Sequence, residues 1–250
     1  MLIVGTSGWQ YRDWKGLFYP RGAAELSYYA AGFATVELNN PFYRLPSRST
    51  FEQWAEQVPS GFVFSVKMSR YLTHIKRLRD PAEPVTRFLR HAAGLGDKLG
   101  PVLLQLPPTL PFDKELLHSV LSRFPRSVRV AVEPRHESWW SSTARKVLEK
   151  HDAALCWADR LGRPLSPLWR TAGFGYVRLH EGRANPRPRY GRVSLSSWLD
   201  RLSVFGHDPV HVYFNNDPGG AALHDAIALA RAAQRRGLEV TRVPEDFGPR

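Results

Sequence analysis

The chain has 250 residues, and its 35 Lys and Arg residues against 23 Asp and Glu residues give a formal net charge of +12. Apolar residues make up 43%, as in folded globular proteins, and the chain lacks the run of about 18 apolar residues that a transmembrane helix needs. Cys156 is the only cysteine, which excludes an intrachain disulfide and a cysteine-based zinc site, and no secretory signal peptide is expected after Met1, so we expect a cytoplasmic protein.

Short runs of apolar and β-branched residues alternate with longer segments of helical periodicity, which is typical of repeated βα units. The runs predict strands at residues 2–6, 35–39, 62–67, 102–106, 128–133, 153–159, 175–180 and 211–216. The segments between them predict helices at residues 47–58, 84–95, 113–124, 141–151, 194–205 and 221–237. Ser47 and Asp113 are expected as N-caps, and Gly237 as the end of the last helix. We also expect helices at about residues 22–31 and after the sixth strand.

Eight strands with helices between them predict a single TIM-type (β/α)8 barrel, an α/β domain that spans residues 1–250. The alternative is an open doubly wound sheet, which usually carries a glycine-rich phosphate-binding turn after its first strand. The glycines of GTSGWQ (5–10) are too close together for that motif, and no helix follows directly. The barrel is therefore the predicted fold.

Side chains of a barrel strand alternate between the interior and the helix layer, and functional residues lie where the strands end. Because Val36 and Leu38 belong to the helix-facing set, Glu37 and Asn39 are expected to point inward. The same alternation predicts a polar interior set near one end of the barrel. Its members are Glu37, Asn39, Lys67, Gln105, Glu133, Tyr176, Arg178, His180, Tyr213 and Asn215, with Arg135 shortly after its strand and with Asn216 and Asp217 at the rim.

Two buried carboxylates that face two cations are a favourable arrangement, because a buried charge is costly unless it has a partner of opposite charge. One interpretation is an internal salt-bridge layer that only fixes the register of the strands. The other is a catalytic site, with Glu133 as general base and Glu37 as acid or orienting group. In that site Lys67 and Arg178 would stabilise a developing anion.

Aromatic residues gather in the loops after three strands. They are Trp9, Tyr11 and Trp14, then Phe42 and Tyr43, then Trp139 and Trp140. Flat apolar faces beside polar groups suit a sugar ring or a nucleobase, although such residues also plug barrel ends. The predicted substrate contacts are Trp9, Tyr11, Tyr43 and Trp139.

Two basic segments follow strands on the same face, KMSRYLTHIKRLR (67–79) and RANPRPRYGR (183–192). Their composition predicts contacts with phosphate, and hence an anionic small molecule or a nucleic acid as partner, with no role for a membrane. A third basic cluster, residues 231–242, lies away from that face, so part of the positive charge belongs to an ordinary surface.

A divalent metal is a further alternative, because carboxylates and histidines are available as ligands. His74, His136 and His180 show no HxH or HxxxH spacing, however, and cations share the interior layer. A metal is therefore not favoured, and the cofactor stays unknown.

At these loops the sequence resembles the YecE-like family, also called domain of unknown function 72. The matching stretches are GTSGWQYRDWKGLFYP (5–20), ELNNPFYRLP (37–46), FSVKMSRYLTH (64–74), LGPVLLQLPP (99–108), AVEPRHESWW (131–140), YVRLHEG (176–182) and VYFNND (212–217). They span nearly the whole chain in the family's order. The resemblance implies a TIM-type barrel and supplies no reaction.

The resemblance also implies a set of site residues. They are Gly8, Trp9, Tyr11, Glu37, Asn39, Tyr43, Lys67, His74, Gln105, Glu133, Arg135, Trp139, Arg178, His180, Asn216 and Asp217. The sequence departs from the family's pattern at Pro41, where a small hydroxyl residue is usual, and at Pro134, where an aromatic is common. A third departure is Glu181, inserted before Gly182, which affects the expected position of His180.

Three functions are open at this point. The first is a hydrolase of phosphodiesterase or nuclease type that cleaves a phosphoester in an anionic, ring-bearing substrate, held by Lys67, Arg135 and Arg178. The second is a sugar isomerase or glycosidase that uses Glu37 and Glu133. The third is a non-catalytic module that binds nucleic acid or a partner protein through its charge.

Overall fold

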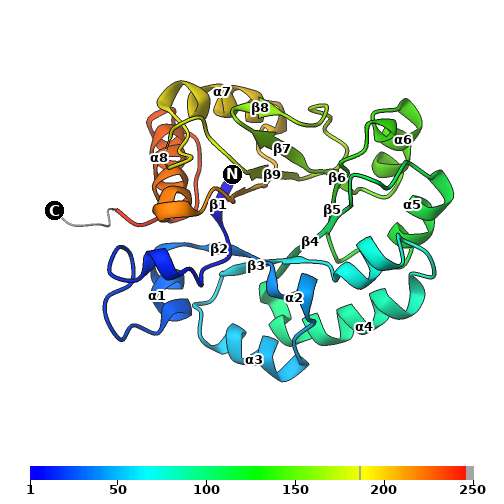
Figure 1. Cartoon of the computed structure of the whole chain (residues 1–250), viewed down its shortest axis with the longest axis horizontal. Coiled ribbons are helices and arrows are strands. Elements are labelled where there is room, and N and C mark those ends of the chain that lie inside the picture. Colours follow the sequence, from blue (N-terminus) through cyan, green and yellow to red (C-terminus); the bar gives the residue numbers. More distant parts are fainter. Residues whose placement is uncertain (186, 246–250) are drawn as a thin grey trace.

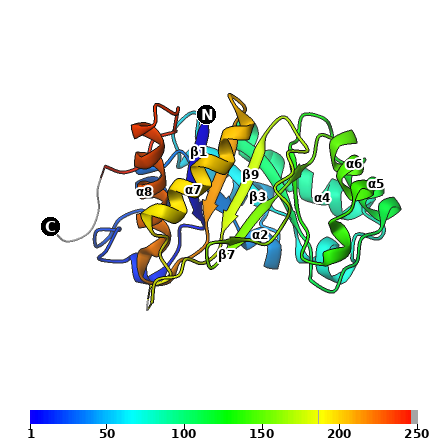
Figure 2. The ribbon, with the colours of Figure 1, turned by 90° about the horizontal axis from the view of Figure 1, so that it is seen from above.

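The computed structural model describes residues 1–185 and 187–245, in which helices surround a strongly curved sheet (Figures 1 and 2). The strands are β1 (Leu2–Ser7), β2 (Thr35–Leu38), β3 (Val63–Lys67), β4 (Leu99–Gln105), β5 (Val130–Glu133), β6 (Ala154–Leu155), β7 (Trp157–Arg160), β8 (Arg163–Pro164), β9 (Gly175–Leu179) and β10 (Val210–Phe214). The α-helices are α1 (Glu25–Gly32), α2 (Asn40–Tyr43), α3 (Arg48–Glu56), α4 (Ala82–Ala92), α5 (Lys114–Leu121), α6 (Ser142–Lys150), α7 (Arg192–Leu202) and α8 (Ala221–Arg235). Short 3-10 turns are η1 (Arg12–Trp14), η3 (Ala93–Lys98), η4 (Glu137–Trp139), η5 (Ser203–Phe205) and η6 (Pro218–Gly220), and η2 (Tyr71–Ile75) is a π turn.

The sheet closes on itself through one interrupted strand. Its order is β6-β5-β4-β3-β2-β1-β10-β9-β7-β8, so β6 and β7 lie near opposite ends of the sheet. Only Cys156 separates these two strands along the chain. β6 pairs in parallel with β5, and β7 pairs in parallel with β9. Residues 154–160 therefore join β5 to β9 and close the barrel. The result is a TIM-type barrel, as the sequence predicts.

With one exception, the predicted strands and helices are confirmed in the described part of the chain, with ends that differ by a few residues. The helix expected after the sixth strand is wrong. Residues 161–174 form the short antiparallel strand β8 and irregular turns instead. Pro164 and Pro167, together with Gly162 and Gly173, explain the difference, because both residue types disfavour a helix interior.

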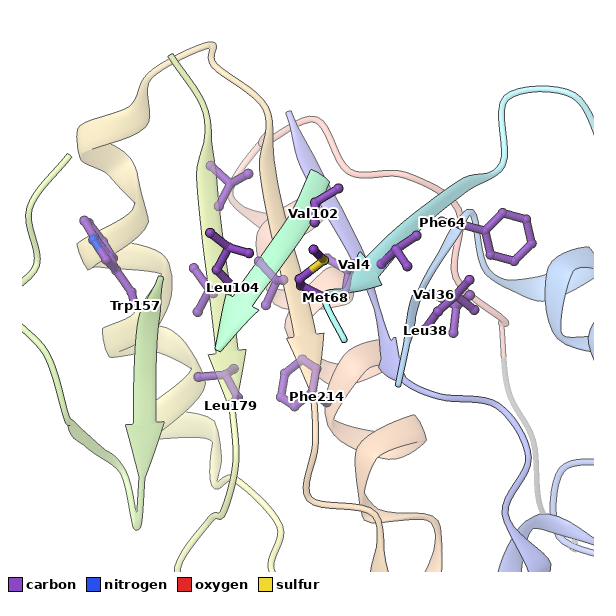
Figure 3. Close-up of a cluster of buried hydrophobic side chains, with 14 of the residues drawn as sticks. Val4, Val36, Leu38, Phe64, Met68, Val102, Leu104, Trp157, Leu179 and Phe214 are labelled. Carbon is purple, nitrogen blue, oxygen red and sulfur yellow. The ribbon is translucent and has the colours of Figure 1, made fainter. Parts of the chain in front are cut away.

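Alternation along the strands divides the buried residues into two layers. Figure 3 shows the outer layer, which includes Val4, Val36, Leu104 and Phe214, side chains that pack between the strands and the helices. A separate inner cluster fills the barrel, and its members are Leu103, Ala131, Ala154, Cys156, Ala172, Phe174, Tyr176 and Tyr213. Tyr176 and Tyr213 of the inward-facing set predicted from the sequence belong to this inner cluster.

Cys156 lies inside the barrel at the break between β6 and β7. Its side chain is fully buried, and this burial raises the pKa of the thiol well above its usual value. Such a thiol is inert rather than nucleophilic.

None of the helices in the described residues has the length and apolar character needed to span a membrane.

The predicted N-caps are present at two helices. Ser47 accepts a hydrogen bond from the backbone of Thr50, and the Asp113 carboxylate accepts bonds from the backbone N–H groups of Glu115 and Leu116. Gly237 adopts the left-handed conformation (φ 73°) just after α8. These local interactions fix where the helices begin and end.

Replacing Asp113 by alanine should lower the free energy of unfolding by about 1 kcal/mol, because two backbone donors of α5 lose their acceptor. Urea denaturation followed by circular dichroism measures the change. Lys146→Ala, at an exposed position of α6, is the matched control and should leave the stability nearly unchanged. Equal stability of the Asp113 variant and the control would contradict the capping role.

Candidate functional site

A single arginine joins the two predicted carboxylates at the carboxyl end of the barrel. Arg178, on β9, donates from Nη1 to Glu133 Oε2 at 2.6 Å and from Nη2 to Glu37 Oε1 at 2.9 Å. The three side chains are at most 2% exposed. Burying these charges is tolerable only because each carboxylate faces the same guanidinium. The structure therefore brings together Glu37, Glu133 and Arg178 as the alternation predicts.

Glu37 is held by neutral donors as well as by the arginine. Ser7 Oγ donates to Glu37 Oε1 at 2.5 Å, and the Tyr176 hydroxyl donates to Oε2 at 2.7 Å. The Asn39 amide in turn donates to Ser7 Oγ at 2.7 Å. Ser7 was missed by the sequence prediction, although the alternation of β1 places it on the inner side. Both carboxylate oxygens of Glu37 are thus occupied.

Glu133 is surrounded by three cationic or donor groups. Arg135 donates to Glu133 Oε1 from Nε at 3.2 Å and from Nη2 at 3.0 Å, and His180 Nε2 lies 3.3 Å from the same oxygen. Burial by itself would raise the pKa of Glu133, but Arg178, His180 and Arg135 together outweigh it and hold the pKa well below its usual value. Glu133 is therefore a fixed anion rather than a proton-exchanging group.

A second contact holds His180 at its other ring nitrogen. Asn215 Nδ2 lies 2.9 Å from His180 Nδ1. Nε2 is the ring atom that faces Glu133. Despite the insertion of Glu181, His180 lies within the predicted group.

Lys67, at the end of β3, is the least satisfied charged group of the site. It is 8% exposed, and its Nζ lies 4.0 Å from the centre of the Phe42 ring. No carboxylate of the described residues lies within ion-pair distance of it. Burial and the charge of Arg178 lower the pKa of Lys67 to about 8, although Glu37 and Glu133 act in the opposite direction. A substantial fraction of the amine is thus neutral near physiological pH.

Aromatic rings lie beside this amine. His74 and Tyr43 both contact the Phe42 ring edge-on, with ring centres 5.0 Å away from it. Burial, together with Lys67, Arg70 and Arg135, lowers the pKa of His74, so its ring is neutral at pH 7. Tyr43 is 71% exposed and can accept a ring stacked on its face. Phe42 belongs to the aromatic group of the sequence prediction but was not among its site residues.

Two predicted stacking residues lie in the core instead. Trp9 is 4% exposed and packs edge-on against Trp54, and Trp139 is 2% exposed and donates from its indole to the Leu110 carbonyl. Neither ring offers a free face to a substrate. Tyr11 donates to the Ser7 carbonyl and is half-buried, so it supports the site from the side.

The remaining predicted residues lie at the edge of the group. Gln105 is 8% exposed, and its side-chain amide makes no hydrogen bond within the described residues, so this amide is free for a ligand. Asn216 is 1% exposed and donates to the Pro188 carbonyl and to Asp225, which ties the loop after β9 to α8. Burial raises the pKa of Asp217 to about 7. In the described residues, no three His, Cys, Asp or Glu side chains form a group able to hold a metal ion.

A family model described as "Protein of unknown function DUF72" matches residues 3–247. The chain is 31% identical to the UPF0759 protein YecE of Escherichia coli K12 over 142 residues, 56% of this chain and 51% of YecE, so it spans about half the length of that relative. It is 25% identical to the UPF0759 protein YunF of Bacillus subtilis, over 89% of this chain and 91% of YunF. The crystal structure of a DUF72 family protein, TM1631 of Thermotoga maritima, superposes with a TM-score of 0.81 at 30% identity, over 94% and 99% of the two chains.

Removing the bridging arginine should destabilise the barrel strongly. Arg178→Met leaves two buried carboxylates without their shared cation, and we expect a loss of about 3–5 kcal/mol in the free energy of unfolding. Adding Glu37→Gln and Glu133→Gln to that variant removes the uncompensated charge and should restore much of the loss. Urea denaturation of the variants tests this, with the exposed Arg145→Met as control. A mild effect of Arg178→Met alone would contradict the bridge.

Because the pKa of Glu133 is low, the free energy of unfolding should fall as the solution becomes more acidic. A carboxyl group with a depressed pKa stabilises the folded state fully above its usual value of 4.5, and this stabilisation is lost as the pH falls below it. The free energy of unfolding should therefore fall less steeply with acid in Glu133→Gln than in the unaltered protein. Denaturant titrations below pH 5 measure the slope. Glu56→Gln, at an exposed position of α3, should keep the original slope.

Proposed function

The chain belongs to the DUF72 family, whose description assigns no reaction, and we propose a function from the site itself. The protein is an enzyme that cleaves a phosphoester in an anionic, ring-bearing substrate, with Lys67 as general base. The observation that carries this proposal is the nearly buried Lys67 amine without a carboxylate partner in the described residues. Charges of a barrel that gather at the carboxyl ends of its strands are typical of a catalytic site.

Lys67 fits a proton-transfer role better than the carboxylates do. A general base works best when its pKa is close to the working pH, and the pKa of Lys67 is about 8. Glu133 has a pKa far below that range, and both oxygens of Glu37 already accept hydrogen bonds. We therefore assign the base to Lys67, and give Glu133 and Glu37 the role of positioning Arg178 and Arg135.

The same contacts weigh against a glycosidase. Glycoside hydrolysis needs one carboxylic acid with a raised pKa and a second free carboxylate. Here Arg178 binds both Glu37 and Glu133, and the pKa of Glu133 is lowered. The glycosidase weighed from the sequence thus has no support in the geometry.

An anionic substrate is favoured by the charges that remain available. Arg135 is 41% exposed at its side chain, and its Nη1 makes no hydrogen bond within the described residues. Its guanidinium can therefore bind phosphoryl oxygens while Nε and Nη2 stay on Glu133. The exposed ring of Tyr43 offers a stacking surface for a base or sugar of the same substrate.

The proposed reaction transfers one proton to Lys67. The neutral amine takes a proton from water as the water oxygen forms a bond to phosphorus, and the bond from phosphorus to the leaving oxygen breaks. The leaving oxygen takes a proton from solvent. Negative charge that develops on the phosphoryl oxygens is stabilised by Arg135.

Purified protein should hydrolyse bis(4-nitrophenyl) phosphate or a nucleotide in assays run with and without divalent metal ions. Because only the neutral amine acts as base, kcat should rise with pH up to about 8 and then level off. Lys67→Met and Lys67→Arg should each lower kcat by about 100-fold or more. Lys146→Met, at an exposed lysine of α6, should leave kcat unchanged.

Full activity of Lys67→Met would contradict the assignment of Lys67 as the general base. Absence of turnover on every phosphoester, with or without metal ions, would overturn the reaction itself. If nucleic acid then binds without turnover, and binding weakens steeply with salt, the non-catalytic binding module is the better description.

A further inference from the structure

A second basic site lies on the same face of the protein as Lys67, outside the barrel. A pocket of about 560 Å³ opens between the turn after β7, the loop after β9 and the start of α7. Its lining includes Gly162, Arg183, Arg189, Tyr190, Ser194 and Arg201. This volume is in the range of pockets that hold small-molecule ligands.

The pocket gathers three arginines, and only Arg189 among them has an ion-pair partner within the described residues. None of its described lining residues is acidic. Arg189 Nε lies 3.6 Å from Asp225 Oδ1, but Arg183 and Arg201 form no ion pair within the described residues. The Arg183 Nε donates only to the Leu161 carbonyl, and Arg201 lies over the Trp198 ring. Arg183 and Arg201 therefore add positive charge to this concave space, which attracts an anion.

The pocket is held in shape by Tyr190, which anchors the loop after β9. Its hydroxyl donates to Asp159 Oδ1 at 2.6 Å and accepts from the backbone of Glu181 at 3.0 Å, and its own backbone N–H donates to Asp225 Oδ2 at 2.8 Å. Burial raises the pKa of Asp225 to about 6, and three groups, Tyr190, Asn216 and Arg189, act against that rise. Arg189 and Tyr190 are thus both tied to Asp225 of α8, and Arg201 is carried by α7.

A glycine keeps one wall of the pocket open. Gly162 has a φ of 71°, and a Cβ at this position would lie 3.5 Å from Ser194 Oγ and 3.6 Å from Arg183 Nε. A larger residue would therefore fill the space between the serine hydroxyl and the guanidinium. Serine hydroxyls and arginine N–H groups are both donors to phosphate oxygens.

We propose that this pocket binds the phosphate group of a small phosphorylated molecule of nucleotide size, with Arg183 and Arg201 as its charged contacts and Ser194 as a neutral donor. A pocket of this volume fits one phosphate ester with an adjoining ring, whereas a nucleic acid would need an extended basic groove. The inference rests on the pocket alone and does not depend on Lys67 acting as a base.

Isothermal titration calorimetry with adenosine 5′-monophosphate and with inorganic phosphate tests the proposal, with adenosine as the ligand that lacks the phosphate. Arg183→Gln removes one charged contact. Ser194→Asp places a carboxylate in the pocket, and because the residue lies in the first turn of α7, the change favours the helix while it repels an anion. Arg235→Gln, at the far end of α8, removes the same charge elsewhere and is the matched control.

We expect the monophosphate and inorganic phosphate to bind and adenosine not to bind. Arg183→Gln and Ser194→Asp should each weaken binding by about tenfold or more, whereas Arg235→Gln should leave it unchanged. Equal binding by the unaltered protein and Ser194→Asp, or no binding of either phosphate compound, overturns the proposal. Binding of a short single-stranded oligonucleotide without binding of the monophosphate also overturns it, in favour of a nucleic-acid surface.

Discussion

The ion bridge of Arg178 with Glu37 and Glu133 is the constraint around which the upper half of the barrel is arranged. It connects β9 with β2 and β5, strands that are not neighbours in the sheet, across the interior of the barrel. A shift of any of these strands by one residue would turn a charged side chain toward the helix layer. The bridge therefore sets the register that places Lys67 and Arg135 at the mouth.

Most of the fold could be predicted from the sequence because the alternation in its strands is regular. Val36 and Leu38 identify the helix-facing side of β2, and that assignment alone puts Glu37 inside the barrel. The same reasoning brings Glu133 and Arg178 to the same end. It fails where the chain leaves regular structure, as in residues 161–174, since prolines and glycines indicate the absence of a helix but not the path that replaces it.

The site itself could be predicted only in part, for a physical reason. Alternation gives the direction of a side chain, but its partners depend on how loops fold over the barrel. Trp9 and Trp139 lie in loops on the expected face, yet both are buried by neighbouring helices and turns. That Lys67 lacks an ion-pair partner could not be predicted from the sequence either. It follows from the fact that Arg178 binds both carboxylates.

The position of Cys156 has a kinetic consequence. The chain has one thiol, and it lies in the sealed interior at the break where the barrel closes. A thiol reagent can reach it only when β6 and β7 separate from the strands beside them. The rate at which Cys156 is modified therefore measures local opening of the barrel at this break. At high reagent concentration it gives the rate of opening, and at low reagent concentration it gives the equilibrium constant of opening.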